Sequence, residues 1–201
     1  MTTIVDLLRH GEPLGGRRYR GQIDDPLSEQ GWREMWHAVS GTPPWQAIIT
    51  SPLRRCSEFA HQLSEKHALP LMVDDRLKEV GFGAWEGFTG QQLRSQDETI
   101  LSRFYHDPLN CRPEGAEDLA SFNQRVSAAY AEAVEAHPGQ HLLIIAHAGV
   151  IRSVLTQTLS APLSHMYRLS IPTASLSRIE IGHERPPTIV FMGRQSLINP
   201  K

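Results

Sequence analysis

Two histidines each end a short apolar run in the sequence. His10 closes residues 3–10 (TIVDLLRH), and His147 closes residues 141–147 (HLLIIAH). Runs of this kind are typical of buried strands, and ligands bind at the carboxyl ends of strands in open α/β sheets. One histidine at a strand end is more often structural. Two at the same kind of junction, one of them beside Arg9, favour contact with a shared small substrate.

Phosphoryl transfer is the chemistry that these residue types fit. Charge spreads over the nonbridging oxygens of a transferring phosphoryl group, and Arg9 and Arg55 could supply paired N–H donors that match phosphate geometry. A neutral imidazole such as that of His10 can attack phosphorus through its free ring nitrogen. The leaving oxygen then needs a proton, so an acid is expected on the far side. The alternative for Arg55 is an exposed charge on a helix, the usual place of an arginine.

The elements that must position these residues follow from the hydrophobic pattern and from Pro and Gly breaks. Strands are expected at residues 3–8, 47–50, 71–73, 141–146, 175–181 and 188–192. Helices are expected at 28–39, at 51–67 with Ser51 as N-cap and Pro52 in the first turn, at 91–107, at 114–136 and after 149. Strands that alternate with helices indicate an α/β fold, a three-layer sandwich in which helices flank a mainly parallel central sheet.

Length and composition exclude several classes of protein. A chain of 201 residues fits a single domain over 1–201, with a small helical insertion around residues 88–114. The net charge of -2 argues against binding to nucleic acid or to anionic membranes. Only Cys56 and Cys111 are present, without CxxC spacing, which favours a reducing compartment. The N-terminus lacks the features of a secretory leader and no apolar window is long enough to span a bilayer, so a cytoplasmic protein is expected.

Five motifs occur in order along the chain. They are LRHGE at residues 8–12, GQIDDPLSEQG at 21–31, TSPLRR at 50–55, LKEVGFGAWEG at 77–87 and AHAGVIR at 146–152. RHG alone would be a chance-level match, but all five together resemble the histidine phosphatase superfamily, which includes the cofactor-dependent phosphoglycerate mutases. The resemblance implies a phosphoglycerate mutase-like fold and a phosphoryl-transfer enzyme.

The resemblance also assigns roles to individual residues. His10 would be phosphorylated and Glu79 would donate the proton to the leaving group, while Arg9, Arg55 and His147 would surround the phosphoryl group. Glu79 by itself could instead be a surface carboxylate. The residues expected to contact the rest of the substrate are Arg17, Arg18, Gly21, Gln22 and Ala148.

The sequence departs from the family pattern at two positions. Gly16 stands where an asparagine often contacts the phosphate, and Gly81 stands where an aspartate is common. The same loop carries Arg17, Arg18 and Arg20, which could replace or extend the missing asparagine contact. A solvated basic loop is the alternative interpretation of these arginines.

Hydrolysis is favoured over mutase chemistry. Phosphoglycerate mutases have a longer insertion after the glutamate motif that helps to close the site, whereas the segment between Gly87 and Gly115 has room for little more than one helix. Among short members of the family the chain most resembles bacterial α-ribazole phosphatases, through its RHGEP opening and its length. This implies that α-ribazole 5′-phosphate, an intermediate of cobalamin nucleotide-loop assembly, is the substrate.

Other functions stay open as alternatives. They are a broad-specificity small-molecule phosphatase, a phosphoglycerate mutase and, less favoured, a non-catalytic protein that binds phosphorylated ligands. A metal-dependent hydrolase is disfavoured because the ten histidines form no HExxH, HxH or HxD cluster. No cofactor and no metal are expected, and the expected partner is a small phosphomonoester, with a homodimer left open.

Overall fold

A six-stranded sheet forms the centre of the protein in the computed structural model, which describes residues 1–41 and 43–196. Its strands are β1 (Thr3–Arg9), β2 (Ala47–Thr50), β3 (Leu71–Val73), β4 (His141–Ala146), β5 (Leu176–Ile181) and β6 (Thr188–Arg194). The strand order is β3-β2-β4-β1-β5-β6. The first four strands pair in parallel, whereas β5 and β6 run antiparallel to their neighbours. The expected mainly parallel sheet is confirmed.

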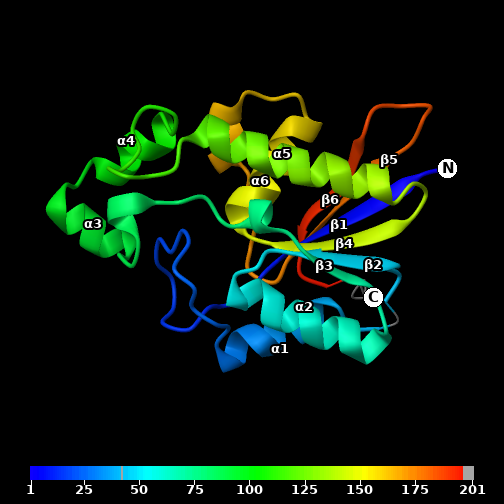
Figure 1. The fold of residues 1–201 in the computed structure, drawn as a ribbon. Coiled ribbons are helices and arrows are strands. Elements are labelled where there is room, and N and C mark those ends of the chain that lie inside the picture. The colour runs from blue at the N-terminus through cyan, green and yellow to red at the C-terminus, as the bar shows by residue number, and fades with distance from the viewer. Residues whose placement is uncertain (42, 197–201) are drawn as a thin grey trace.

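Helices cover both faces of this sheet. The α-helices are α1 (Glu29–Ala38), α2 (Arg54–His67), α3 (Gly90–Gln96), α4 (Ile100–His106), α5 (Leu119–Ala136) and α6 (Ala148–Thr158). Short 3-10 turns lie at Asp75–Leu77, Gly83–Trp85 and Leu163–Arg168. Helices α1 and α2 lie on one side of the sheet and α5 and α6 on the other (Figure 1). The molecule is therefore the expected three-layer sandwich.

The core follows the alternation of side chains along the strands. Leu7 packs in the cluster that includes residues of α5 and α6, while its neighbour Leu8 packs with residues of α1 and α2. Ile144 and Ile145 divide in the same way. Successive residues of a strand point to opposite faces, so a continuously apolar strand buries one cluster on each side of the sheet.

Helix starts agree with the sequence at α1 and differ at α2. Ser28 caps α1 by accepting a hydrogen bond from the backbone N–H of Gly31, as expected. The prediction that Ser51 caps α2 is wrong, because the helix begins only at Arg54. The cap comes instead from a distant loop, where Asp24 Oδ1 accepts the Arg54 backbone N–H at 2.7 Å.

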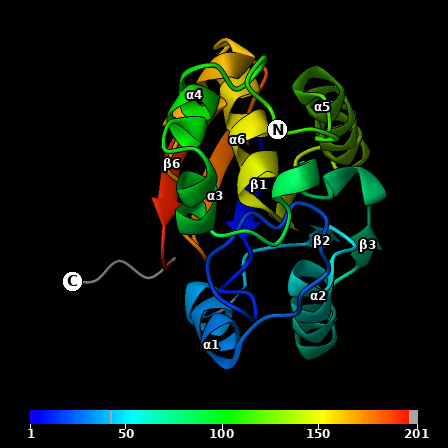
Figure 2. The same ribbon diagram turned by 90° about the vertical axis from the view of Figure 1, so that its left-hand side faces the viewer.

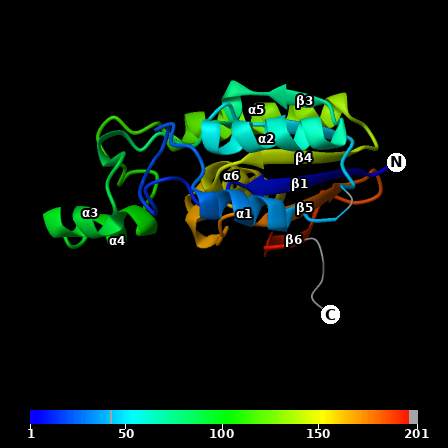
Figure 3. The same cartoon turned by 90° about the horizontal axis from the view of Figure 1, so that it is seen from below.

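The predicted helix at 91–107 is two helices, α3 and α4. Asp97 ends α3 in an extended conformation, and its Oδ1 atom accepts the backbone N–H of Thr99. The carboxylate thus stabilises the turn that separates the two helices. The pair stands beyond the end of the sheet toward which β1 runs (Figures 2 and 3), in the segment where the insertion was expected. Leu93 and Phe104 anchor it in the main core cluster.

Helix α5 begins later than predicted. Residues 114–118 form a turn and an extended segment, and Asp118 caps the helix through the backbone N–H of Ser121. Among the described residues no helix is long and apolar enough to cross a membrane.

Candidate active site

Two adjacent parallel strands bring the histidines together. Arg9 pairs in register with Ala146, so the next residue on each strand, His10 or His147, lies at the same edge of the sheet. The His10 backbone N–H donates to the Ala146 carbonyl at 3.0 Å. The two imidazole rings approach edge to face, with centroids 5.2 Å apart. The sequence prediction that these two strand ends converge agrees with this geometry.

The orientation of His10 leaves one ring nitrogen free. Its Nδ1 atom lies 2.7 Å from the carbonyl oxygen of Gly11, which can only accept, so Nδ1 carries the proton and Nε2 carries the lone pair. Burial lowers the pKa of His10 well below the usual value, and the charges of Arg9 and Arg55 lower it further. The ring is therefore neutral at pH 7, as a nucleophile requires.

His147 is held by buried polar neighbours. Its Nε2 atom lies 2.7 Å from Ser51 Oγ, and the thiol of Cys56 lies 3.6 Å from the same nitrogen. Neither His147 nor Ser51 is exposed to solvent. Burial lowers the pKa of His147 as well, with further lowering by Arg55 and His10. Ser51 was predicted only as a helix cap, and the structure gives it this different contact.

Both expected arginines have buried donors without an acceptor. Arg55 is 1% exposed and donates from its terminal nitrogens to the carbonyls of Gly21 and Ile23, so it is not the exposed helix charge of the alternative interpretation. Arg9 donates to the carbonyl of Ile171. The Nε atoms of both have no hydrogen-bond partner within the described part of the chain. A buried donor left unpaired is costly, and an oxyanion in the pocket would supply the acceptor.

Arg9 also lies in a crowd of positive charge. Its burial, partly offset by Glu79, and the like charges of Arg152, Arg17 and Arg55 lower the pKa of its guanidinium to about 10. It therefore stays protonated at neutral pH, and an anion beside it would relieve the repulsion.

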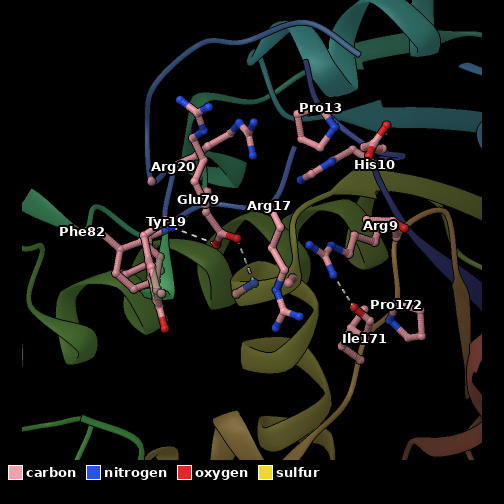
Figure 4. A pocket seen from close by; sticks show the side chains of 18 of the residues that line it. Arg9, His10, Pro13, Arg17, Tyr19, Arg20, Glu79, Phe82, Ile171 and Pro172 are labelled. Atoms are coloured by element: carbon pink, nitrogen blue, oxygen red, sulfur yellow. Dashed lines mark hydrogen bonds between the residues drawn. The ribbon is translucent and has the colours of Figure 1, made fainter. Parts of the chain in front are cut away.

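Glu79 lines the same pocket as His10 and Arg9 (Figure 4). Its Oε1 atom accepts the backbone N–H of Val80 at 2.9 Å, and Oε2 accepts that of Gly149 at 3.1 Å. A side chain at Gly149 would overlap Glu79, since a Cβ atom there would lie 2.2 Å from Oε1. The carboxylate is thus fixed in place by the backbone of two separate segments.

The three arginines of the loop after β1 have different surroundings. Arg20 is buried and pairs with Asp25 at 2.9 Å, so it is a structural residue of the loop. Arg18 is exposed and donates to the carbonyl of Gly15. Arg17 reaches into the pocket (Figure 4). Among these three arginines, only Arg17 is directed at the pocket and has no side-chain hydrogen bond or ion pair recorded within residues 1–41 and 43–196.

The other expected substrate contacts divide between the pocket and its support. Ala148 and Gly21 line the pocket. Gly21 has a φ of +51°, and a Cβ atom there would lie 1.9 Å from Glu86 Oε1, so the position requires glycine. Gln22 is not among the lining residues, and its side-chain amide donates to the carbonyl of Glu79. Gly16 lines the pocket, while the Gly81 carbonyl accepts the backbone N–H of Glu117.

The pocket has a volume of about 960 Å³ and includes residues that sequence reasoning missed. Arg152 and Tyr167 come from α6 and the turn after it, and Arg94 and Tyr105 come from α3 and α4. The sequence did contain a signal for Arg152, because this residue lies one helical turn after the predicted substrate contact Ala148, on the same face of α6. The residues of α3 and α4 had no such sequence signal, because only the tertiary fold brings these two helices to the pocket. No three His, Cys, Asp or Glu side chains are grouped to hold a metal ion in the described residues.

The chain is similar to proteins of two bacteria. It is 33% identical over 183 residues to the bifunctional protein Rv2228c of Mycobacterium tuberculosis. This alignment covers 89% of this chain and 50% of that protein. The chain therefore spans half the length of this relative. It is 31% identical over 182 residues to the probable phosphoglycerate mutase GpmB of Yersinia pestis, covering 88% of this chain and 84% of that one.

Solved structures share the fold. The mycobacterial glucosyl-3-phosphoglycerate phosphatase Rv2419c superposes with a TM-score of 0.85 at 25% identity, over 96% of this chain and 100% of that one. A putative α-ribazole-5′-P phosphatase of Escherichia coli K-12 superposes with a TM-score of 0.82 over 98% and 99%, but at 22% identity this likeness concerns the fold alone. Residues 5–194 match the family model of the histidine phosphatase superfamily, branch 1. His147 is buried beside His10 and is not among the residues that line the pocket, whereas the other four predicted site residues are. The family match spans residues 5–194, and the chain therefore belongs to the histidine phosphatase superfamily.

Proposed function

We propose that the protein is a phosphomonoester hydrolase that works through a phosphohistidine on His10. The observation that carries the proposal is the free Nε2 of a neutral, buried His10 beside two arginines with unpaired buried donors. A phosphate monoester placed there meets both a nucleophile and the donors that its oxygens need.

The first step forms a bond between His10 Nε2 and phosphorus and breaks the bond from phosphorus to the ester oxygen. A protonated Glu79 gives its proton to that oxygen, so the alcohol leaves neutral. In the second step the Glu79 carboxylate takes a proton from water, whose oxygen attacks phosphorus as the bond to Nε2 breaks. Inorganic phosphate leaves, and both His10 and Glu79 return to their starting states.

Arg9, Arg55 and His147 stabilise the charge that develops during transfer. The two guanidiniums stay fixed by backbone carbonyls, so no reorganisation is needed when the phosphoryl oxygens move. His147 stands edge-on to His10 and can donate to a phosphoryl oxygen. No metal ion takes part in this scheme.

Water rather than a second alcohol accepts the phosphoryl group in this proposal. A mutase must keep its phosphohistidine while the product turns over in the site, which requires a closed site. Here α3 and α4 are helices of 7 residues each, a short cover for a pocket of about 960 Å³. This supports hydrolysis, with phosphoglycerate mutase as the alternative.

The substrate that the sequence favours is α-ribazole 5′-phosphate, and the alternative is broad specificity for small phosphomonoesters. A panel separates them: phosphate release from α-ribazole 5′-phosphate, sugar phosphates, nucleotides and phosphoglycerates, measured in chelator with His10→Ala as control. A kcat/KM for α-ribazole 5′-phosphate at least about tenfold above the panel, about 1.4 kcal/mol, supports the cobalamin role. Activity that survives His10→Ala contradicts the reaction scheme, and activity lost in chelator contradicts its independence of metal.

A further inference from the structure

The pocket holds more positive charge than one phosphoryl group needs. Three glutamates line it: Glu12, Glu34 and Glu79. Seven arginines line it: Arg9, Arg17, Arg18, Arg20, Arg55, Arg94 and Arg152. The whole chain has a net charge of -2, so this excess is a local feature of the pocket.

Four of these arginines have a function without any further ligand. Arg9 and Arg55 serve the phosphoryl group in the proposed reaction. Arg20 is neutralised by Asp25, and Arg18 is turned back onto the carbonyl of Gly15. Arg17, Arg152 and Arg94 are left over.

Arg152 is built into the wall of the pocket. Its Nε atom donates to the carbonyl of Leu169 at 2.9 Å, and its guanidinium stands over the ring of Tyr167, 5.5 Å from the centroid. These contacts fix the side chain through one edge and one face. Its terminal nitrogens have no hydrogen-bond partner in the part of the chain that the structure describes, so they can bind a ligand.

Arg17 approaches the same space from the loop after β1. Figure 4 shows it extending into the pocket beside Arg9 and Glu79. Within residues 1–41 and 43–196 the structure records no hydrogen bond and no ion pair for its side chain. Arg17 and Arg152 lie close enough to Arg9 that both lower the pKa of its guanidinium. Three guanidiniums gathered from two sides, with one nearby carboxylate, favour more than one bound anion.

Building on the proposed function, we infer that the alcohol part of the substrate carries a second anionic group, which Arg17 and Arg152 bind. The second group is a carboxylate or another phosphate, because both arginines line the same pocket as Arg9 and a guanidinium binds either anion. Arg94, exposed on α3, also lines the pocket, and its positive charge favours a second anionic group on the substrate.

This inference separates the candidate substrates. An alcohol without an anionic group, such as the α-ribazole of the sequence-based candidate, leaves Arg17 and Arg152 unpaired in a pocket crowded with positive charge. A phosphorylated hydroxy acid pairs with both.

The test compares esters that differ in the second group. We would measure kcat/KM for glycerol 3-phosphate, for 3-phosphoglycerate and for propane-1,3-diol bisphosphate. At least one of the last two esters, each of which carries a second anionic group, should have a kcat/KM about tenfold or more above that of glycerol 3-phosphate. The ester with the larger ratio of kcat/KM to that of glycerol 3-phosphate identifies the second group. In Arg17→Gln and Arg152→Gln each ratio should fall at least about threefold, and in the double variant it should approach one.

Arg54→Gln is the matched control. Arg54 adjoins Arg55 in sequence but pairs with Glu58 at 2.7 Å and is not among the residues lining the pocket, so its loss removes a nearby charge without touching the subsite. Its ratios should equal those of the wild type. Ratios near one in the wild type, or ratios unchanged in the double variant, would overturn the inference. Failure of the proposed function looks different, because then no ester is hydrolysed in a manner that depends on His10.

Discussion

The hydroxyl oxygen of Ser51 lies 2.7 Å from Nε2 of His147, and both side chains are fully buried. Ser51 Oγ also accepts the backbone N–H of Leu53 at 3.4 Å, so its own proton is available for the His147 ring. This hydrogen bond fixes the ring of His147 beside His10.

Replacing Ser51 by alanine should lower kcat much more than it changes KM. Without the hydroxyl the His147 ring loses the hydrogen bond that orients it, and misplacement of a catalytic group can cost about 100-fold in rate. We expect kcat to fall about 10- to 100-fold in steady-state assays. Ser57→Ala is the control, because the Ser57 hydroxyl donates to the carbonyl of Pro52, just before α2, and the structure records no other side-chain hydrogen bond for it among the described residues. Full activity of Ser51→Ala would refute the positioning role.

The role of Glu79 as a proton donor predicts a dependence on the leaving group. Glu79→Gln cannot transfer a proton, so the first turnover with an alkyl phosphate should slow by about 100-fold or more. With 2,4-dinitrophenyl phosphate, whose leaving group needs no proton, the burst of dinitrophenol should keep its rate within about threefold. Rapid-mixing measurements of both esters on one variant give the comparison. Equal slowing of the two bursts would argue against proton donation.

Burial of His10 and His147 links stability to pH. Both pKa values are lowered in the folded protein, so below the ordinary imidazole pKa of about 6.5 the unfolded chain binds more protons than the folded one. The free energy of unfolding should therefore fall as pH falls from 7 toward 5, by up to about 1.4 kcal/mol per unit for each histidine. When the free energy of unfolding from urea denaturation is plotted against pH over this range, its slope should be shallower for His10→Gln than for the wild type. Identical slopes would contradict the neutral, buried state of His10.

The loop that carries His10 depends on a close contact between glycines. A Cβ atom on Gly31 of α1 would lie 2.1 Å from the carbonyl oxygen of Glu12, and one on Gly11 would lie 2.3 Å from that of Gly31. Gly31→Ala should destabilise the fold by about 1–3 kcal/mol and lower kcat, because the backbone of residues 11–12 must move. Gly182→Ala is the control, since its nearest contact would be 3.6 Å. Thermal unfolding that leaves Gly31→Ala at the wild-type Tm would show that α1 adjusts freely.

The parts of the fold and site that local pattern and strand topology determine could be predicted from the sequence. His10 and His147 are far apart in the chain, yet both follow apolar runs, and the parallel pairing of β1 with β4 makes these runs neighbours. The order of strands and helices follows in the same way from hydrophobic period and from breaks at Pro and Gly.

The remaining features depend on contacts between distant segments. Ser51 and Pro52 carry the signals of a helix start, but the cap of α2 is Asp24, and no local pattern reports a cap supplied by another loop. Arg17 and Arg152 also come from distant segments, so the charge of the outer pocket could be found only in three dimensions.

Trapping of the phosphorylated enzyme tests the central claim most directly. The protein would be mixed with a 32P-labelled substrate found active in the ester panel, quenched within milliseconds in alkali and mapped by mass spectrometry, with His10→Ala and His147→Ala beside it. The account predicts an acid-labile, base-stable phosphoryl group on His10 that forms and decays at rates matching turnover and is absent in His10→Ala. A label on any other residue, or turnover without a phosphoenzyme, would contradict it.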